Sequence, residues 1–176
     1  MTLVFDLETD GLLGQATRIH CLAIYDSEDN TTTAYNDQTL TETVVTGITR
    51  LEAADHIVGH NIIGFDIPII RRFYPFFNYT GTIIDTLILS RLYHNNIIAI
   101  DRKSNWNHMP SQLYGRHSLE SYGYRLGEYK GEFSKTTDWK EWSQEMEDYC
   151  IQDVKVTTKL CDHFRPYLTG SDLNIR

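Results

Sequence analysis

The sequence predicts an α/β domain with a mixed central sheet flanked by helices. A strand–turn–strand pattern occupies the first 35 or so residues, and short apolar runs then alternate with helical periods. A long amphipathic helix follows near the end of the chain. An N-terminal hairpin followed by strand–helix alternation is typical of a sheet with both antiparallel and parallel strands. The 176 residues, 41% of them hydrophobic, suffice for one core.

Each expected strand is a short apolar or β-branched run bounded by turn residues: 2–6, 18–26, 31–35, 57–60 and 82–85. The expected helices show a 3.6-residue apolar period: 40–54, 64–73, 86–93, 118–126 and 139–164. Residues 95–116 show no clear period and are expected to form a long loop, and long loops in compact domains are often functional. We expect one domain over residues 1–168 and a polar tail over 169–176.

Composition narrows the class of protein. No apolar stretch approaches the ~18 residues of a membrane span, and the N-terminus lacks the basic start of a signal peptide. Three unclustered cysteines, Cys21, Cys150 and Cys161, argue against a disulfide framework and against a zinc site. We therefore expect a cytoplasmic protein without a membrane partner. The net charge of −8 leaves two possibilities: no contact with nucleic acid, or a grip on few nucleotides through cations, amides and stacking.

Asp6 and Glu8 stand at the end of the first expected strand, where alternate residues point to the same face. Two carboxylates ~4 Å apart repel by roughly 4 kcal/mol at an effective dielectric of 20. A cation between them would reverse the sign of this energy. The alternative is that the strand ends here and leaves the sheet into solvent, with Glu8 and Asp10 simply hydrated.

Asp66 lies in an apolar run, His-Asn-Ile-Ile-Gly-Phe-Asp-Ile-Pro-Ile-Ile, which spans residues 60–70. A buried carboxylate is costly without a partner. Asp66 is therefore either a catalytic group or an N-cap, the latter because Pro68 would then fall near the first turn of a helix.

The last expected helix carries an apolar stripe with one polar interruption. The stripe comprises Trp142, Met146, Tyr149, Val156, Leu160 and Phe164. Asp153 fills the gap in this stripe, one turn after Tyr149, so the two side chains share a face. The alternatives are a functional carboxylate beside a tyrosine and an Asp–Tyr hydrogen bond inside the core.

The order and spacing of these motifs resemble a known family. Asp-x-Glu at 6–8, His-Asn-x-x-x-Phe-Asp at 60–66 and Tyr-x-x-x-Asp at 149–153 are similar to the tyrosine (DEDDy) branch of the DEDD 3′→5′ exonucleases, which have an RNase H-like fold. More closely, the chain resembles the proofreading domain of family A polymerases from T-odd short-tailed phages. Further matching segments are 85–92, 117–120, 124–128 and 130–132.

The resemblance implies a metal-dependent phosphodiester hydrolase. Two divalent cations, Mg²⁺ or Mn²⁺, would be held by hard oxygen ligands: Asp6, Glu8, Asp66 and Asp153. Asp6 would bridge both cations, Glu8 and Asp153 would complete the one that activates water, and Asp66 would hold the other through water. Tyr149 would align the attacking water, since a side chain with a pKa near ~10 is a poor general base at neutral pH.

The resemblance also implies contacts with the substrate. Leu12 matches the position of an apolar wedge between the last two bases, with an ordinary core leucine as the alternative. Phe65 would stack on a base, and Asn61 would contact the sugar-phosphate. His60 is expected to end a core strand, and Asp85 is expected to cap a helix. The basic residues Arg102, Lys103 and Arg116 would either contact phosphates or belong to a solvated loop.

These features predict an exonuclease that trims the 3′ ends of single-stranded DNA to nucleoside monophosphates, in a host cytoplasm if the chain is phage-encoded. An RNA exonuclease of RNase D type uses the same residues and remains an alternative. A catalytically silent replication module is another, although all five catalytic positions are filled. The histidine (DEDDh) branch is disfavoured because Asp148, not histidine, precedes Tyr149. A separately encoded DNA polymerase is a possible partner.

Overall fold

The computed structural model describes residues 1–38, 40–104, 106, 108–128 and 138–168. The expected tail at 169–176 and the matching segment 130–132 lie outside this part of the chain. Within the described residues, no helix is long and apolar enough to cross a membrane. The three cysteines are free and buried.

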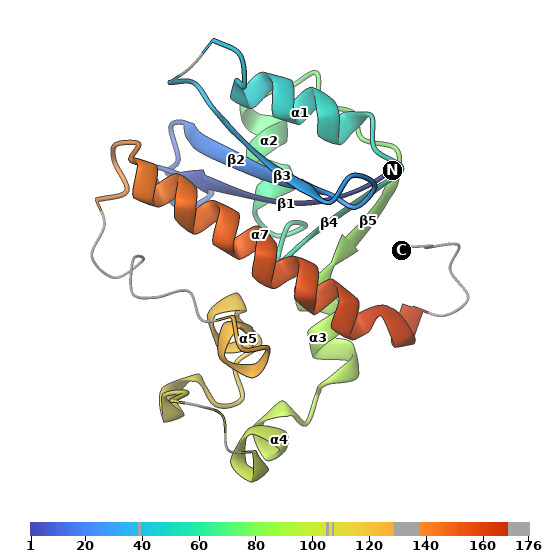
Figure 1. Cartoon of the computed structure of the whole chain (residues 1–176). Coiled ribbons are helices and arrows are strands. Elements are labelled where there is room, and N and C mark those ends of the chain that lie inside the picture. Colours follow the sequence, from blue (N-terminus) through green and yellow to red (C-terminus); the bar gives the residue numbers. More distant parts are fainter. Residues whose placement is uncertain (39, 105, 107, 129–137, 169–176) are drawn as a thin grey trace.

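A five-stranded mixed sheet forms the centre of the described molecule, in the order β3-β2-β1-β4-β5 (Figure 1). Its strands are β1 (Thr2–Thr9), β2 (Ile19–Asp26), β3 (Thr31–Asn36), β4 (His56–Gly59) and β5 (Thr82–Asp85). The first three strands are antiparallel neighbours, while β4 and β5 run parallel to β1. This arrangement confirms the predicted mixed sheet. It also places the carboxyl ends of β1, β4 and β5 at one edge, where α/β folds bind ligands.

The described helices are α1 (Val44–Glu52), α2 (Asp66–Phe73), α3 (Thr86–Tyr93), α4 (Ile97–Lys103), α5 (Leu119–Arg125) and α7 (Gln144–Phe164), with short 3-10 turns η1 (Ser111–Leu113) and η2 (Arg165–Leu168). Helices lie on both faces of the sheet, and α4 and α5 lie away from it, beyond α7 (Figure 1). In Figure 1, α7 crosses one face while α1 and α2 lie on the other. Thr43 and Ser143 cap α1 and α7 with their side chains, so these helices begin a few residues later than the apolar period indicates.

The alternation of β1 separates two cores. Leu3, Phe5 and Leu7 point toward α1 and α2 and belong to the larger buried cluster. Val4 points to the other face, where it packs with residues of α7 such as Met146 and Val154. Side chains at even positions of β1 therefore face α7. Asp6 and Glu8 are at even positions, so their side chains lie on the α7 face of the sheet.

The expected loop at 95–116 is wrong in part, because α4 and η1 fall inside it. This segment lacks a long apolar stripe, and the buried carboxylate of Asp101 holds its parts together. Asp101 is fully buried and accepts hydrogen bonds from Arg125 Nε at 2.9 Å, from Trp106 Nε1 at 3.0 Å and from the Gly115 N–H at 2.8 Å. The segment packs through Ile97 and α5 onto the C-terminal half of α7.

Candidate active site

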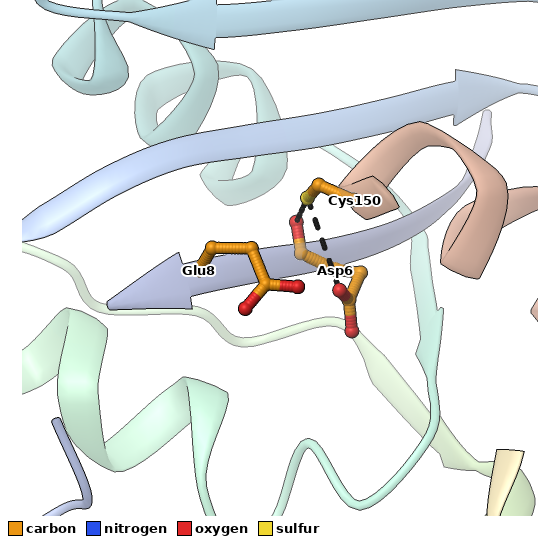
Figure 2. A group of neighbouring side chains, drawn as sticks. All are labelled: Asp6, Glu8 and Cys150. Atoms are coloured by element: carbon orange, nitrogen blue, oxygen red, sulfur yellow. Dashed lines mark hydrogen bonds between the residues drawn. The ribbon is translucent and has the colours of Figure 1, made fainter. Parts of the chain in front are cut away.

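Asp6 and Glu8 lie side by side on the α7 face of β1. Both are half-buried and both remain within the ladder, paired with Ala23 and Cys21 of β2. The strand is longer than predicted, so the alternative that it leaves the sheet before Glu8 is wrong. Figure 2 shows the two carboxylates on the same side of the strand. Their oxygens fall within 4.8 Å of one another, close enough to share a cation.

Asp66 enters the site from a tight turn after β4. Gly59 ends that strand, and a Cβ there would lie 2.2 Å from Ile62 Cγ2 and 3.0 Å from the Phe5 carbonyl oxygen. Asn61 follows in the left-handed region with a φ of 66°. The turn then delivers Asp66 as the first residue of α2, with Phe65 at the N-cap position. The interpretation of Asp66 as the N-cap is therefore wrong.

Tyr149 and Asp153 come from successive turns of α7 and face the same cleft. The predicted helical face is confirmed: Asp153 is 7% exposed, and the stripe residues Met146, Val156, Leu160 and Phe164 are buried. Tyr149 is half-buried. Its ring packs edge-on against Trp139, with ring centroids 6.2 Å apart and an interplanar angle of 76°. Tyr149 thus borders the cleft and not the closed core.

One cleft of about 230 Å³ collects the predicted catalytic residues. Its lining contains the four carboxylates and the tyrosine, together with two of the expected substrate residues: Asp6, Glu8, Asp66, Asp153, Tyr149, Asn61 and Phe65. Leu7, His60 and Trp139 complete it. Residues separated by up to 147 positions in the sequence therefore converge at one place, the carboxyl edge of the parallel strands.

A second cavity of about 400 Å³ adjoins the cleft and shares Glu8, Phe65 and Trp139 with it. Leu12 lines this cavity and is 73% exposed, so it is not an ordinary core leucine. Its turn is fixed by hydrogen bonds from the N–H groups of Gln15 and Ala16 to the Leu12 carbonyl oxygen, at 2.7 and 2.8 Å. An apolar side chain held out at the mouth of the site is therefore a feature of the folded turn.

The buried thiol of Cys150 supports Asp6 from behind. Cys150 projects from α7, and its sulfur lies 3.3 Å from the Asp6 carbonyl oxygen and 3.8 Å from Asp6 Oδ2 (Figure 2). Burial raises the pKa of the Cys150 thiol well above its ordinary value. The sulfur is thus a protonated donor that holds Asp6. The prospective metal ligands remain the hard carboxylate oxygens.

Asp66 bears a large electrostatic penalty in the cleft. It is 3% exposed, and burial, together with the nearby charges of Asp85 and Asp153, raises the pKa of Asp66 to about 7. Backbone N–H bonds, including one from Leu7, oppose this rise only in part. Among the described residues its buried Oδ1 atom has no hydrogen-bond partner. A hard cation is the group that such an oxygen fits.

The remaining residues considered in the sequence analysis lie beside the cleft or outside it. His60 follows β4 and lines the cleft, with Nδ1 2.9 Å from the Thr86 hydroxyl. Asp85 caps α3 as predicted, through the Leu87 N–H at 2.9 Å. The basic residues of the 95–116 segment line neither cavity: Arg102, Lys103 and Arg116. All three are exposed.

Sequence reasoning missed Trp139, Cys150 and the wider role of Asp85. Trp139 was expected to begin a helix, but it precedes the Ser143 cap and lies in a connecting segment. No periodicity points from that position to the cleft. Cys150 follows Tyr149 directly, and its placement against Asp6 depends on how α7 crosses the sheet. Only the tertiary structure reveals these two contacts.

A comparison with known proteins agrees with this geometry. The family model described as the RNase H superfamily matches residues 3–165, nearly the whole chain. The chain belongs to the RNase H superfamily. This membership confirms the predicted RNase H-like fold, a mixed sheet flanked by helices.

Two curated relatives of this RNase H superfamily chain are DNA-directed DNA polymerases. The polymerase of Enterobacteria phage T3 is 31% identical over 182 residues, and that of Escherichia phage T7 is 30% identical over 182 residues. Each match covers 91% of this chain and 26% of the polymerase. The chain therefore spans about a quarter of the length of these relatives.

Solved nucleases share the fold at lower identity. A structure described as the apo form of a nuclease has a TM-score of 0.68 at 20% identity, covering 95% of this chain and 72% of that one. Brucella melitensis NrnC with bound Mg²⁺ has a TM-score of 0.63 at 19% identity, covering 95% and 73%. E. coli Exonuclease I in complex with an oligonucleotide has a TM-score of 0.60 at 17% identity, covering 95% and 41%.

Proposed function

We propose that this chain is a metal-dependent 3′→5′ exonuclease that hydrolyses single-stranded DNA ends to nucleoside monophosphates. The observation that carries the proposal is the convergence of Asp6, Glu8, Asp66, Asp153 and Tyr149 on one small cleft. Four carboxylates around about 230 Å³ repel one another strongly, and burial makes this worse at Asp66. Such a set is costly for a structural core and suited to divalent cations.

Two divalent cations, Mg²⁺ or Mn²⁺, fit this donor set. All four groups offer hard oxygens, and the buried Oδ1 of Asp66 is an oxygen that needs a positive partner. Asp6, Glu8, Asp66 and Asp153 would hold the cations. When bound, such cations neutralise phosphate charge, lower the pKa of water and stabilise the leaving oxygen. The Mg²⁺-bound NrnC structure, which shares the fold, supports this choice.

The protein's own groups would orient the reactants. Tyr149 borders the cleft and its hydroxyl would hydrogen-bond the attacking water, aligning it with the scissile phosphate. The edge-on contact with Trp139 restricts the Tyr149 ring. Asn61, fixed in a left-handed turn, would contact the sugar-phosphate, while Phe65 and Leu12 would receive bases in the adjoining cavity.

Several findings favour a DNA end and a polymerase partner. Both matched proteins are named DNA-directed DNA polymerases, and the chain matches about a quarter of the length of each. The net charge of −8 provides few cations for gripping long DNA. We propose that the chain proofreads beside a polymerase, encoded separately or in the same polypeptide, whose basic surface supplies DNA affinity. Such work takes place in the cytoplasm of the host if the chain is phage-encoded.

The decisive experiment is degradation of 5′-labelled single-stranded DNA, duplex DNA with matched or mismatched 3′ ends, and single-stranded RNA, each with Mg²⁺, Mn²⁺ or EDTA. We expect ladders that shorten one nucleotide at a time from the 3′ end, fastest on single strands and mismatched ends. Unpairing a matched end costs energy before it can enter the cleft. EDTA should abolish all cleavage.

The matched control is Asp29→Asn, which removes a carboxylate from the exposed turn between β2 and β3, outside the cleft lining. It should cleave like the wild type, whereas Asp6→Asn should not cleave. Digestion from the 5′ end, internal cutting, or full activity in EDTA would contradict the proposal. A clear preference for RNA would redirect it to an RNA exonuclease with the same chemistry. The processivity of the chain, measured in a trap-chase assay, should rise when the proposed partner polymerase is added.

A further inference from the structure

Trp139 is the wall shared by the catalytic cleft and the adjoining cavity. It lines the 230 Å³ cleft with Tyr149 and Asp153, and it lines the 400 Å³ cavity with Leu12 and Phe65. Glu8 and Phe65 are the other residues common to both linings. The indole therefore stands at the boundary between the place for the scissile phosphate and the space beside it.

A bulge in the sheet explains how Trp139 is held there. Glu8 pairs with Cys21 and Thr9 pairs with Ile19, so His20 is an extra residue on β2. Bulges re-aim side chains and occur near active sites. Here the bulged His20 is buried, and its Nε2 donates a hydrogen bond to the Trp139 carbonyl oxygen at 3.0 Å. This contact ties the segment before α7 to the end of the catalytic strand.

The cavity has the chemistry of a nucleobase site. Its lining includes three apolar or aromatic residues, Leu12, Phe65 and Trp139. The polar residues of the lining are Glu8, Thr9, Asp10 and Gln15. Aromatic faces bind any base by stacking, which is tolerant of sequence. Its volume of about 400 Å³ falls in the range of small-molecule sites. An exonuclease that removes all four nucleotides requires such tolerance.

We propose that Trp139 is a substrate-binding residue that receives one unpaired nucleobase against its indole, opposite Leu12 and Phe65. This inference rests on the proposed exonuclease function. It also gives Trp139 a second effect, because the same indole packs edge-on against Tyr149. A base seated on Trp139 fixes the indole, and the fixed indole restricts the Tyr149 ring at the moment when the phosphate lies in the cleft. Binding of the base and alignment of water are thereby linked.

The test pairs a protein truncation with a substrate truncation. The substrates are 5′-fluorescein-labelled single strands with normal bases, or with one abasic residue at the last, second or third position from the 3′ end. Binding is measured by fluorescence anisotropy in EDTA, and cleavage by gel in Mg²⁺. For the wild type, an abasic residue at one of these positions should weaken binding roughly 10-fold, in line with loss of one stacked base. Trp139→Ala should weaken binding of the normal strand by a similar factor.

The coupling between the two truncations decides the outcome. Trp139→Ala should cause no further loss on the strand that already lacks the base at the sensitive position. Trp139→Phe, which keeps an aromatic face, should recover most of the affinity and guards against a folding defect in the alanine variant. Trp142→Phe is the matched control, because Trp142 lines neither cavity, and it should bind like the wild type. Melting temperatures verify that each variant is folded.

Equal weakening of normal and abasic strands by Trp139→Ala at every position would overturn the assignment of Trp139. So would unchanged binding of the normal strand by that variant. Failure of the proposed function has a different signature, since it appears in the wild type itself as an absence of 3′ shortening in Mg²⁺ and in Mn²⁺.

Discussion

The Asp85 carboxylate accepts the backbone N–H of Asn61 at 2.9 Å, across 24 residues of sequence. The same carboxylate accepts the N–H groups of Ile63 at 3.1 Å and Leu87 at 2.9 Å. One buried side chain at the end of β5 therefore caps α3 and fixes the turn that carries Asn61 and Asp66. Asp85 positions the site without lining the cleft itself.

Removing the Asp85 carboxylate should damage both stability and turnover. Asp85→Ala leaves three backbone N–H groups without their acceptor, and we expect the free energy of unfolding to fall by about 2–4 kcal/mol. Because the turn delivers Asp66, kcat should fall more than KM rises. Urea unfolding and steady-state cleavage measure the two effects. Asp29→Asn, a change at an exposed turn, is the control. A full kcat in a folded Asp85→Ala protein would show that the turn holds its shape without this carboxylate.

Asp66 should illustrate a conflict between stability and activity. Burial, with Asp85 and Asp153 nearby, raises the pKa of Asp66 to about 7, so its ionised form is unfavourable in the folded protein. At pH 8 in EDTA, Asp66→Asn should therefore raise the melting temperature by about 2–4 °C, equivalent to roughly 1 kcal/mol. The variant should lose cleavage and much of the stabilisation that Mg²⁺ gives the wild type. A lower melting temperature for Asp66→Asn in EDTA would contradict this account.

Tyr149→Phe should slow cleavage by roughly 10–10³-fold, the range of one lost positioning contact. The phenyl ring keeps the edge-on contact with Trp139, so the fold should not change. Asp153→Asn should reduce cleavage far more, because a cation ligand is weakened. Single-turnover rates at saturating Mg²⁺ separate the two variants. Equal single-turnover rates for wild type and Tyr149→Phe would reassign Tyr149 to packing.

Most of the fold and the carboxylate set could be predicted because their signals are periodic or motif-like. Asp6 and Glu8 lie on one strand and Tyr149 and Asp153 on one helix, as predicted. Their i, i+2 and i, i+4 spacings therefore place each pair on one face. Local evidence left Asp66 open between a cap and a catalytic group. The helix start at Asp66, with Phe65 as N-cap, excludes the cap, and the cleft brings Asp66 to the other carboxylates.

The contacts that could not be predicted depend on packing between distant segments. The Cys150–Asp6 contact requires the crossing of α7 over β1, and the Trp139–His20 contact requires a bulge that no local residue pattern announces. The helix α4 was missed for a related reason. It is held by an ion pair between Asp101 and Arg125, 24 residues apart, and by the packing of Ile97, and its sequence has too short an apolar period to reveal a helix.

The Asp101–Arg125 pair should make stability of the α4–α5 region depend on acidity. Burial alone would raise the pKa of Asp101, but hydrogen bonds from Arg125, Gly115 and Trp106 hold the pKa below its ordinary value. A carboxyl group with a lowered folded-state pKa stabilises the protein above its unfolded pKa of ~3.9, and this stabilisation is lost as the pH falls through the lower, folded-state pKa.

Asp101→Asn should therefore be costly at neutral pH and much less costly in acid. At pH 7 the variant leaves the Arg125 guanidinium, whose side chain is 6% exposed, buried without its counter-charge, at a cost of about 3–5 kcal/mol. As the pH falls below the unfolded-state pKa of ~3.9, unfolded Asp101 binds a proton that the folded carboxylate resists, so the wild type loses this stabilisation and the difference between the two proteins should shrink. Urea unfolding at pH 7, 5 and 3, followed by tryptophan fluorescence, measures this difference.

Arg165→Gln, which removes an exposed pair with Asp162, is the control and should change stability by less than about 1 kcal/mol at every pH. A constant difference between wild type and Asp101→Asn from pH 7 to pH 3 would show that the ionised carboxylate does not stabilise this region.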